Sequence, residues 1–115
     1  MARASKCRRV CAEPQARSFR PECPTEHAQT LSVEELEALR LCDLEGLEQG
    51  EAARMMEVSR GTLQRILYAA RRKTACALVN GMRILIEGGH YKVNPHCGTC
   101  GKACRYCEQG DVENE

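Results

Sequence analysis

Aromatic residues and long hydrophobic runs are scarce in this chain of 115 residues. It contains no Trp and one Phe, and aromatic residues make up 3% of the sequence. So little aromatic bulk disfavours a large β-core, whereas the Leu- and Ala-rich middle favours packed helices. The longest aliphatic run, residues 84–86, is far too short to cross a bilayer, and no apolar segment follows the basic N-terminus as in a secretory signal. We therefore expect a small cytoplasmic protein with no membrane partner.

Signatures of catalysis are also missing. The sequence has no Gly-rich phosphate loop, no Ser/His/Asp set in a recognisable order and no paired-carboxylate motif. His27 and His90 each stand alone without a surrounding pattern, so neither is assigned a role. We expect that the protein is not an enzyme and has no catalytic residues.

Acidic residues are absent from one long segment. Residues 58–86 hold six basic residues and no acidic one, whereas residues 31–57 hold eight acidic and two basic residues. The formal net charge of the whole chain is only +1, so charge is segregated rather than in excess. Such segregation is typical of a nucleic-acid surface on an acidic body. The alternative is a basic face that is merely solvated or binds another protein.

The order of segments predicts a mostly α fold: a three-helix helix-turn-helix unit, a short β-hairpin and a Cys-rich C-terminal knuckle. The hairpin is expected because two short apolar segments flank Gly88 and Gly89. The predicted divisions are a basic, extended, Cys-containing N-terminal arm (1–30), the helix-turn-helix domain (31–81), the β-hairpin (82–93), the Cys-rich metal-binding knuckle (94–110) and an acidic tail (111–115).

The first helix has a clear start and stop. Thr30 or Ser32 can cap it, and Ser32 with Glu35 fits a capping box, while Gly46 is a natural end. We expect Arg40 and Asp43 to form an ion pair at the margin of its apolar face. That face is expected to contain Val33, Leu36, Leu39, Leu44 and Leu47.

Two further helices, over about 48–57 and 60–80, have the features of a helix-turn-helix. Ala53 is small where two helices must cross closely, and Ser59 is well placed to cap the third helix. Glu57, however, stands where the sharp turn usually favours Gly. A left-handed conformation would cost a non-Gly residue roughly 1 kcal/mol, so we expect a slightly altered turn.

The third helix separates an apolar face from a basic one at about 100° per residue. Arg and Gln can each form two hydrogen bonds with a base, and Gly61 permits close approach to DNA. The DNA-binding residues predicted on and beside this face are Arg60, Gly61, Thr62, Gln64, Arg65, Tyr68, Arg71, Arg72 and Lys73. Its five cations predict a slope of log affinity against log salt of about −4 to −5.

Four segments, CRRVCAEP, LSVEELEALRLCDLEGL, SRGTLQRILYAARRKTACALVNG and ILIEGGHY, resemble a family of small bacterial and archaeal proteins of unknown function. Members of that family are described as DNA-binding, with a helix-turn-helix similar to the C-terminal region of bacterial sigma factors. The resemblance covers residues 6–92. It implies a sigma-like three-helix unit and a regulatory role.

The nine cysteines include two CxxC pairs near the C-terminus, Cys97 with Cys100 and Cys104 with Cys107. Four thiolates can form a closed tetrahedral zinc site, but the short gap between the pairs equally fits a four-cysteine iron–sulfur cluster. Cys7, Cys11 and His96 are alternative ligands, and a thiol switch is a further alternative. Cys42 and Cys76 are expected at the core margin.

These features predict a sequence-specific DNA-binding regulator of transcription whose partners are double-stranded DNA, RNA polymerase and a second copy of the chain. A metal or redox response would act through the cysteines, and Lys6, Arg8 and Arg9 would form a second basic cluster on the arm. The rival hypotheses are an iron–sulfur redox or cluster-assembly protein and a protein-binding helical adaptor.

Overall fold

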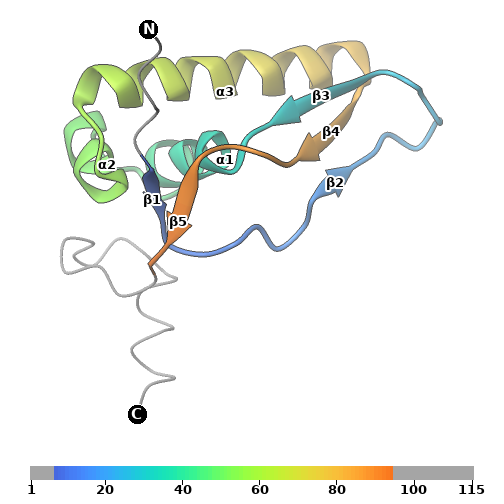
Figure 1. Cartoon of the computed structure of the whole chain (residues 1–115). Coiled ribbons are helices and arrows are strands. Elements are labelled where there is room, and N and C mark those ends of the chain that lie inside the picture. Colours follow the sequence, from blue (N-terminus) through green and yellow to red (C-terminus); the bar gives the residue numbers. More distant parts are fainter. Residues whose placement is uncertain (1–6, 95–115) are drawn as a thin grey trace, which may run out of the picture.

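A computed structural model describes residues 7–94 of the chain, and it contains three α-helices, one π-helix and five short strands. Helix accounts for 47% and strand for 18% of these residues. The long helix α3 lies along one side of the molecule, with α1, α2 and the strands packed beneath it (Figure 1). The strands are β1 (Arg8–Val10), β2 (Ser18–Phe19), β3 (Ala28–Leu31), β4 (Arg83–Ile86) and β5 (Tyr91–Val93).

The first helix begins where the sequence predicts. Ser32 caps α1 (Val33–Leu39), and a complete capping box joins the Ser32 and Glu35 side chains to each other's backbone N–H groups. The helix then continues as the π-helix η1 (Arg40–Leu44). A π-helix turns less per residue than an α-helix, so it rotates the apolar face. Leu41 is consequently buried, and Leu44, which we expected on the apolar face, is 62% exposed.

The second and third helices also match their predicted bounds. The helix α2 (Gln49–Met56) is followed by a short turn, and Ser59 caps α3 (Arg60–Asn80) by accepting a hydrogen bond from the Thr62 N–H. Glu57 adopts the left-handed conformation, with φ 61° and ψ 43°. The expectation of an altered turn was therefore wrong, because the turn keeps its shape with Glu in place of Gly.

The predicted hairpin is wrong. Instead, β4 lies in the middle of a three-stranded sheet, antiparallel to β2 and parallel to β3, and β5 pairs in parallel with β1. Both neighbours of β4 lie almost entirely within residues 1–30, which we expected to be an extended arm. The prediction of a mostly α fold was therefore wrong, because the described chain combines three helices with two small sheets, and Gly88 and Gly89 connect those sheets rather than forming a hairpin turn. The predicted Cys-rich knuckle lies outside the described residues.

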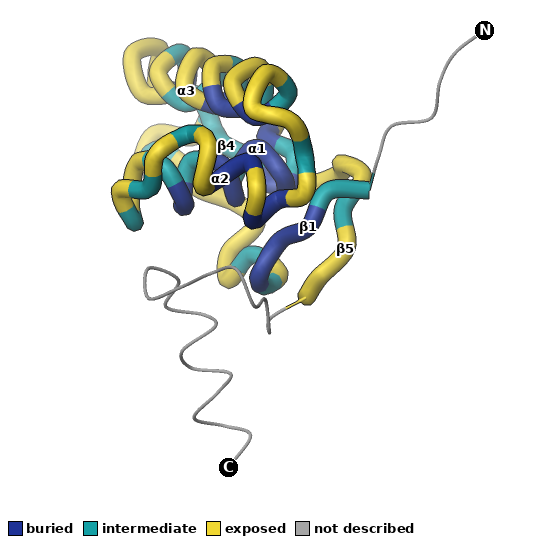
Figure 2. Tube along the Cα trace, turned by 90° about the vertical axis from the view of Figure 1, so that its left-hand side faces the viewer, coloured by how far each residue is buried: buried dark blue, intermediate teal, exposed yellow. Residues whose placement is uncertain are grey.

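The core has two adjoining parts, one beneath each half of α3. The first part joins η1, α2 and α3 through Leu41, Met56 and Leu63, and the other joins α3 to the strands through Leu31, Ala70 and Ile86. Figure 2 shows buried residues along the inward side of α3 and exposed ones along its outward side. Within residues 7–94, no helix is long and apolar enough to span a membrane.

Candidate nucleic-acid interface

The outward face of α3 carries most of the side chains that we predicted to bind DNA. Arg60, Gln64, Arg65 and Arg72 are exposed, and Tyr68 keeps 52% of its surface accessible. Gln64 Nε2 lies 3.4 Å from the Tyr68 hydroxyl, and Arg65 donates to the Thr62 hydroxyl at 3.1 Å. No acidic side chain pairs with Arg60, Arg65 or Arg72 within the described residues. These three guanidinium groups therefore remain available to an external anion.

Gly61 lies at the start of this face. A Cβ atom built there would meet only the Arg65 guanidinium, at 3.9 Å. The backbone of the first turn of α3 is therefore open to solvent on this side, and a large ligand can approach it closely.

Arg71 differs from its neighbour Arg72 because it already has an anionic partner. Its Nε and Nη2 atoms donate to the two carboxylate oxygens of Asp43 on η1, at 3.1 and 2.7 Å. These hydrogen bonds raise the pKa of Arg71, so the group stays charged. Its guanidinium also lies 6.0 Å from the centre of the Tyr68 ring. Arg71 therefore already has an anionic partner on η1, unlike Arg72, and its predicted contact with phosphate would have to compete with Asp43.

Lys73 and Thr62 use their polar groups in contacts within the fold. The Lys73 ammonium contacts both oxygens of Glu35 at 3.0 Å, which ties α3 to α1. Thr62 is only partly exposed, and its hydroxyl accepts hydrogen bonds from Ser59 and Arg65 at the helix start. Six of the nine predicted residues are therefore exposed on α3 and do not pair with an acidic side chain of the described residues. They are Arg60, Gly61, Gln64, Arg65, Tyr68 and Arg72.

Much of the acidic charge in residues 31–57 is neutralised inside the fold. Glu34 pairs with Arg8 at 3.4 Å and accepts from the His90 N–H, and Glu37 forms a two-bond contact with Arg40. Arg40 also reaches Glu45, so the predicted pair between Arg40 and Asp43 was wrong. The segregation of charge along the sequence thus reflects internal pairing as well as an exposed basic face.

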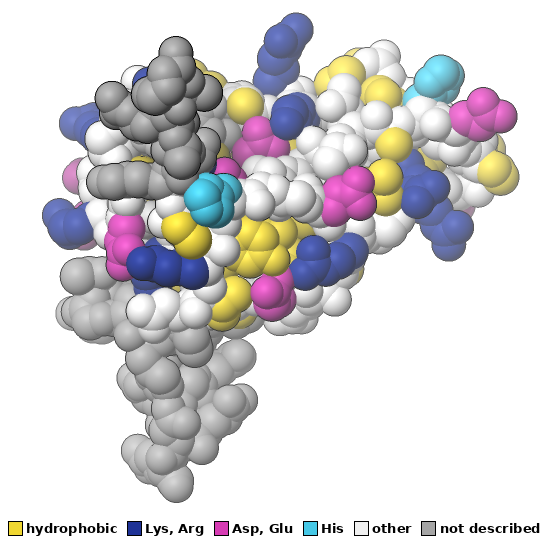
Figure 3. Space-filling model, in the orientation of Figure 1, with side chains coloured by type: hydrophobic (Ala, Val, Ile, Leu, Met, Phe, Trp, Pro, Cys, Tyr) yellow, Lys and Arg dark blue, Asp and Glu magenta, His cyan; other side chains and the backbone are white. Residues whose placement is uncertain are grey.

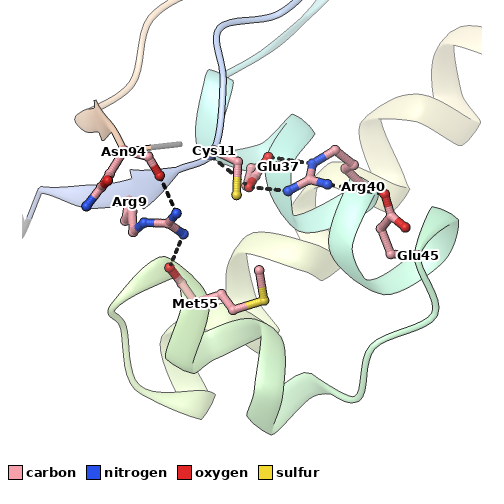
Figure 4. A network of polar contacts seen from close by, with 7 residues as sticks. All are labelled: Arg9, Cys11, Glu37, Arg40, Glu45, Met55 and Asn94. Atoms are coloured by element: carbon pink, nitrogen blue, oxygen red, sulfur yellow. Dashed lines mark hydrogen bonds and ion pairs between the residues drawn. The ribbon is translucent and has the colours of Figure 1, made fainter. Parts of the chain in front are cut away.

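Arg9, which we expected in an exposed basic cluster of the N-terminal arm, is only 1% exposed. Its Nη1 donates to the Met55 carbonyl at 3.1 Å, and its Nη2 donates to the Asn94 carbonyl (Figure 4). A buried Arg on β1 therefore joins the last turn of α2 to the residue that follows β5. Sequence reasoning placed Arg8 and Arg9 in a phosphate-binding cluster; instead both are used within the fold. Nothing in the sequence around Arg8 and Arg9 indicated that their side chains would form contacts inside the fold.

The cysteines of the described part do not form a metal site. No three His, Cys, Asp or Glu side chains of residues 7–94 come together as metal ligands. Cys11 is fully buried in the core, and its N–H donates to Glu37 at 3.2 Å, whereas Cys7 is partly exposed. Burial raises the pKa of the Cys42 thiol, which keeps it protonated at the core margin. The predicted ligands His96, Cys97, Cys100, Cys104 and Cys107 lie outside the described residues.

Comparison with known proteins shows a single family. A sequence model described as "Protein of unknown function DUF134" matches residues 1–94. The chain is 47% identical over 122 residues to a UPF0251 protein of Caldicellulosiruptor saccharolyticus, covering 97% of this chain and 88% of the relative. It is 54% identical over 96 residues to one of Thermoanaerobacter pseudethanolicus, covering 81% of each chain. No solved structure matches. The chain therefore belongs to the DUF134 family of proteins of unknown function.

Proposed function

We propose that this protein binds double-stranded DNA and regulates transcription, with α2 and α3 acting as a helix-turn-helix similar to that of sigma factors. One observation supports this most: the outward face of α3 presents Arg60, Arg65 and Arg72 without acidic partners in the described residues, with Gln64 exposed among them. A solvated helix face ordinarily carries charges of both signs. This face is shaped and charged for a major groove.

Within the proposal, the residues divide by their place on α3. Gln64 and Arg65 lie near the helix start, the part of a recognition helix that contacts base edges. Each has a side chain able to form two hydrogen bonds with a purine. Arg72 lies two turns later and contacts the phosphate backbone. One such helix reads few base pairs, so we expect a second copy of the chain or RNA polymerase to supply further specificity.

The first test is the salt dependence of DNA binding, measured by fluorescence anisotropy on a site selected from random duplexes. With Arg65 on a base, two guanidinium groups per monomer, Arg60 and Arg72, neutralise phosphates, and about 0.9 counterions released by each gives an expected slope of roughly −2. This is smaller than the slope expected from sequence, because Arg71 and Lys73 are paired with Asp43 and Glu35. Affinity that does not change with salt would overturn the proposal.

The second test separates sequence reading from general affinity. Gln64→Ala and Arg65→Ala should each cost about 1–3 kcal/mol on the selected site and little on random DNA. Arg17→Ala is a matched control, because Arg17 is exposed on the loop before β2 and pairs with Glu13 at 2.8 Å. Equal losses on selected and random DNA would show that Gln64 and Arg65 do not read bases.

A further inference from the structure

Two arginines, Arg20 directly after β2 and Arg83 at the start of β4, line one pocket at the end of the β2–β4 pair. In this antiparallel pair, Ser18 lies opposite Leu85 and Phe19 opposite Ile84. Arg20 follows the last paired residue of β2, and Arg83 is the first residue of β4. The two residues bring two like charges to one pocket, which is unfavourable without a counter-charge. A nearby negative charge would stabilise two arginines placed in this way.

The two guanidinium groups share a pocket. It has a volume of about 380 Å³ and is lined by Arg20, Pro21, Glu22, Pro24, Thr25 and Arg83. It lies at the end of the molecule formed by the β2–β3 loop, where Figure 3 shows Lys and Arg side chains beside one another. Both ends of this loop are held to β4, by the β2 pairing and by a 3.0 Å hydrogen bond from the Arg83 N–H to the His27 carbonyl.

The cations of this pocket lack partners within residues 7–94. Neither Arg20 nor Arg83 forms an ion pair there, although Glu22 lines the same pocket. The Nε atom of Arg83 is buried and has no hydrogen-bond acceptor among the described residues. The same holds for the Nε atoms of Arg8 and Arg9, so this atom alone does not mark a ligand site. The unpaired charges carry the argument, because an external anion would supply the counter-charge that Arg20 and Arg83 lack among the described residues.

Thr25 adds a neutral donor to the pocket. Its Oγ1 accepts a 3.1 Å hydrogen bond from the His27 N–H. A hydroxyl that accepts through one lone pair still has its own proton to donate. The pocket therefore offers two guanidinium groups and one hydroxyl donor, with one carboxylate on its wall and two prolines that limit the freedom of the loop.

We infer that this pocket binds phosphate, either as a phosphate monoester of a small molecule or as a free ion. A phosphate dianion neutralises both cations, and its oxygens match the fork of donors that a guanidinium presents. The Glu22 carboxylate is placed to accept a hydrogen bond from a hydroxyl or amino group elsewhere on the ligand, which a monoester supplies and inorganic phosphate does not. The site is independent of the α3 face, so its existence does not rest on DNA binding.

The experiment titrates inorganic phosphate and, separately, adenosine 5′-monophosphate into the ¹⁵N-labelled full chain in a phosphate-free buffer, followed by NMR. Shifts should concentrate in residues 20–25 and at Arg83, and the monophosphate should bind more tightly than the ion. Arg20→Gln and Arg83→Gln should each weaken binding about tenfold or more, because each removes charge-assisted hydrogen bonds. Arg17→Gln, three residues before Arg20 and already paired with Glu13, should bind as the parent does.

Arg20 is exposed, so Arg20→Gln tests the site even if Arg83→Gln disturbs the central strand. The melting temperature should rise with phosphate in the parent and not in Arg20→Gln, since a ligand stabilises only the state that binds it. The salt slope of DNA binding should be unchanged in Arg20→Gln; a smaller slope would show that the pocket contacts the DNA backbone and would overturn its assignment to a small phosphate ligand. Absence of phosphate-induced shifts, or an unchanged affinity in Arg20→Gln, would overturn the inference.

Discussion

At the scale of single residues, some arginines of this molecule form contacts within the fold, whereas others are exposed and can contact a ligand. Arg71 and Arg72 are adjacent in sequence, yet the first is held by two hydrogen bonds to Asp43 and the second has no acidic partner in the described residues. Arg9 is buried, forms no ion pair within residues 7–94 and donates to carbonyl oxygens instead. The environment of each cation, rather than its presence in a basic segment, decides whether it can contact a ligand.

Glycine at position 89 is required by both conformation and space. Its φ is 107°, and a Cβ atom there would collide with Glu34 Oε1 and lie 3.1 Å from the Ser32 Cβ. Gly89→Ala should therefore lower the free energy of unfolding by roughly 1–3 kcal/mol, as measured by urea denaturation. The damage should extend to Glu34, which holds Arg8 and the His90 N–H.

Gly50 provides the matched control for that substitution. It lies in the first turn of α2, and a Cβ atom there would meet nothing within 4 Å. Gly50→Ala should leave stability unchanged or raise it by up to about 1 kcal/mol, because Ala is the better helix former. If the two Ala variants unfold at the same urea concentration, the close packing around position 89 is not as described.

At the scale of elements, the helices were predictable and the strand pairing was not. Caps and apolar periodicity are local signals, so Ser32, Ser59 and Gly81 mark the helix ends in the sequence as they do in the structure. The strands β1 and β5 pair although about 80 residues separate them, and no local signal records such a pairing. Gly88 and Gly89 suggested a hairpin turn because both hairpin turns and other bends use the positive φ that Gly readily adopts, and here both glycines have positive φ in the connection between β4 and β5.

The candidate site was predictable to a similar degree. The helical wheel identified the outward row of α3, because that row depends only on helix geometry. It could not identify the partners of Arg71 and Lys73, since both acids come from the α1–η1 segment, 28 and 38 residues earlier in the chain. The π-helix also shifts Leu41 inward and Leu44 outward, which an ideal α-helical wheel cannot show.

The pairing of Arg71 gives a direct prediction for α3. Arg72→Ala should reduce the salt slope of DNA binding by about 1, because it removes one phosphate contact. Arg71→Ala should leave that slope nearly unchanged, since Asp43 already neutralises its charge. The DNA affinity of both variants should be measured by fluorescence anisotropy on random duplex DNA at several salt concentrations. A fall of similar size in both variants would show that DNA displaces Asp43 from Arg71.

At the scale of the whole molecule, the buried Arg9 links the proposed DNA-binding helices to Asn94, the last described residue. The two ends of the described chain meet where β1 pairs with β5, and Arg9 bridges Asn94 to Met55 in the last turn of α2. Nearby, Lys92 on β5 pairs with Glu57 in the turn before α3, at 2.9 Å. The small β1–β5 sheet is thus bonded to the last turn of α2 through Arg9 and to the α2–α3 turn through Lys92, and Cys97 follows Asn94 by only three residues.

This connection makes the metal hypothesis for Cys97, Cys100, Cys104 and Cys107 testable together with DNA binding. A double Cys100→Ser, Cys104→Ser variant should lose its metal by elemental analysis, because two thiolate ligands are gone. Visible absorption of the parent distinguishes an iron–sulfur cluster from colourless zinc. If metal binding orders the chain that follows Asn94, its loss weakens the restraint on the α2–α3 turn, and DNA affinity should fall. Cys23→Ser, on the exposed β2–β3 loop, should keep both metal and affinity. Clear loss of metal with unchanged DNA affinity would show that the cysteines and the α3 face act independently.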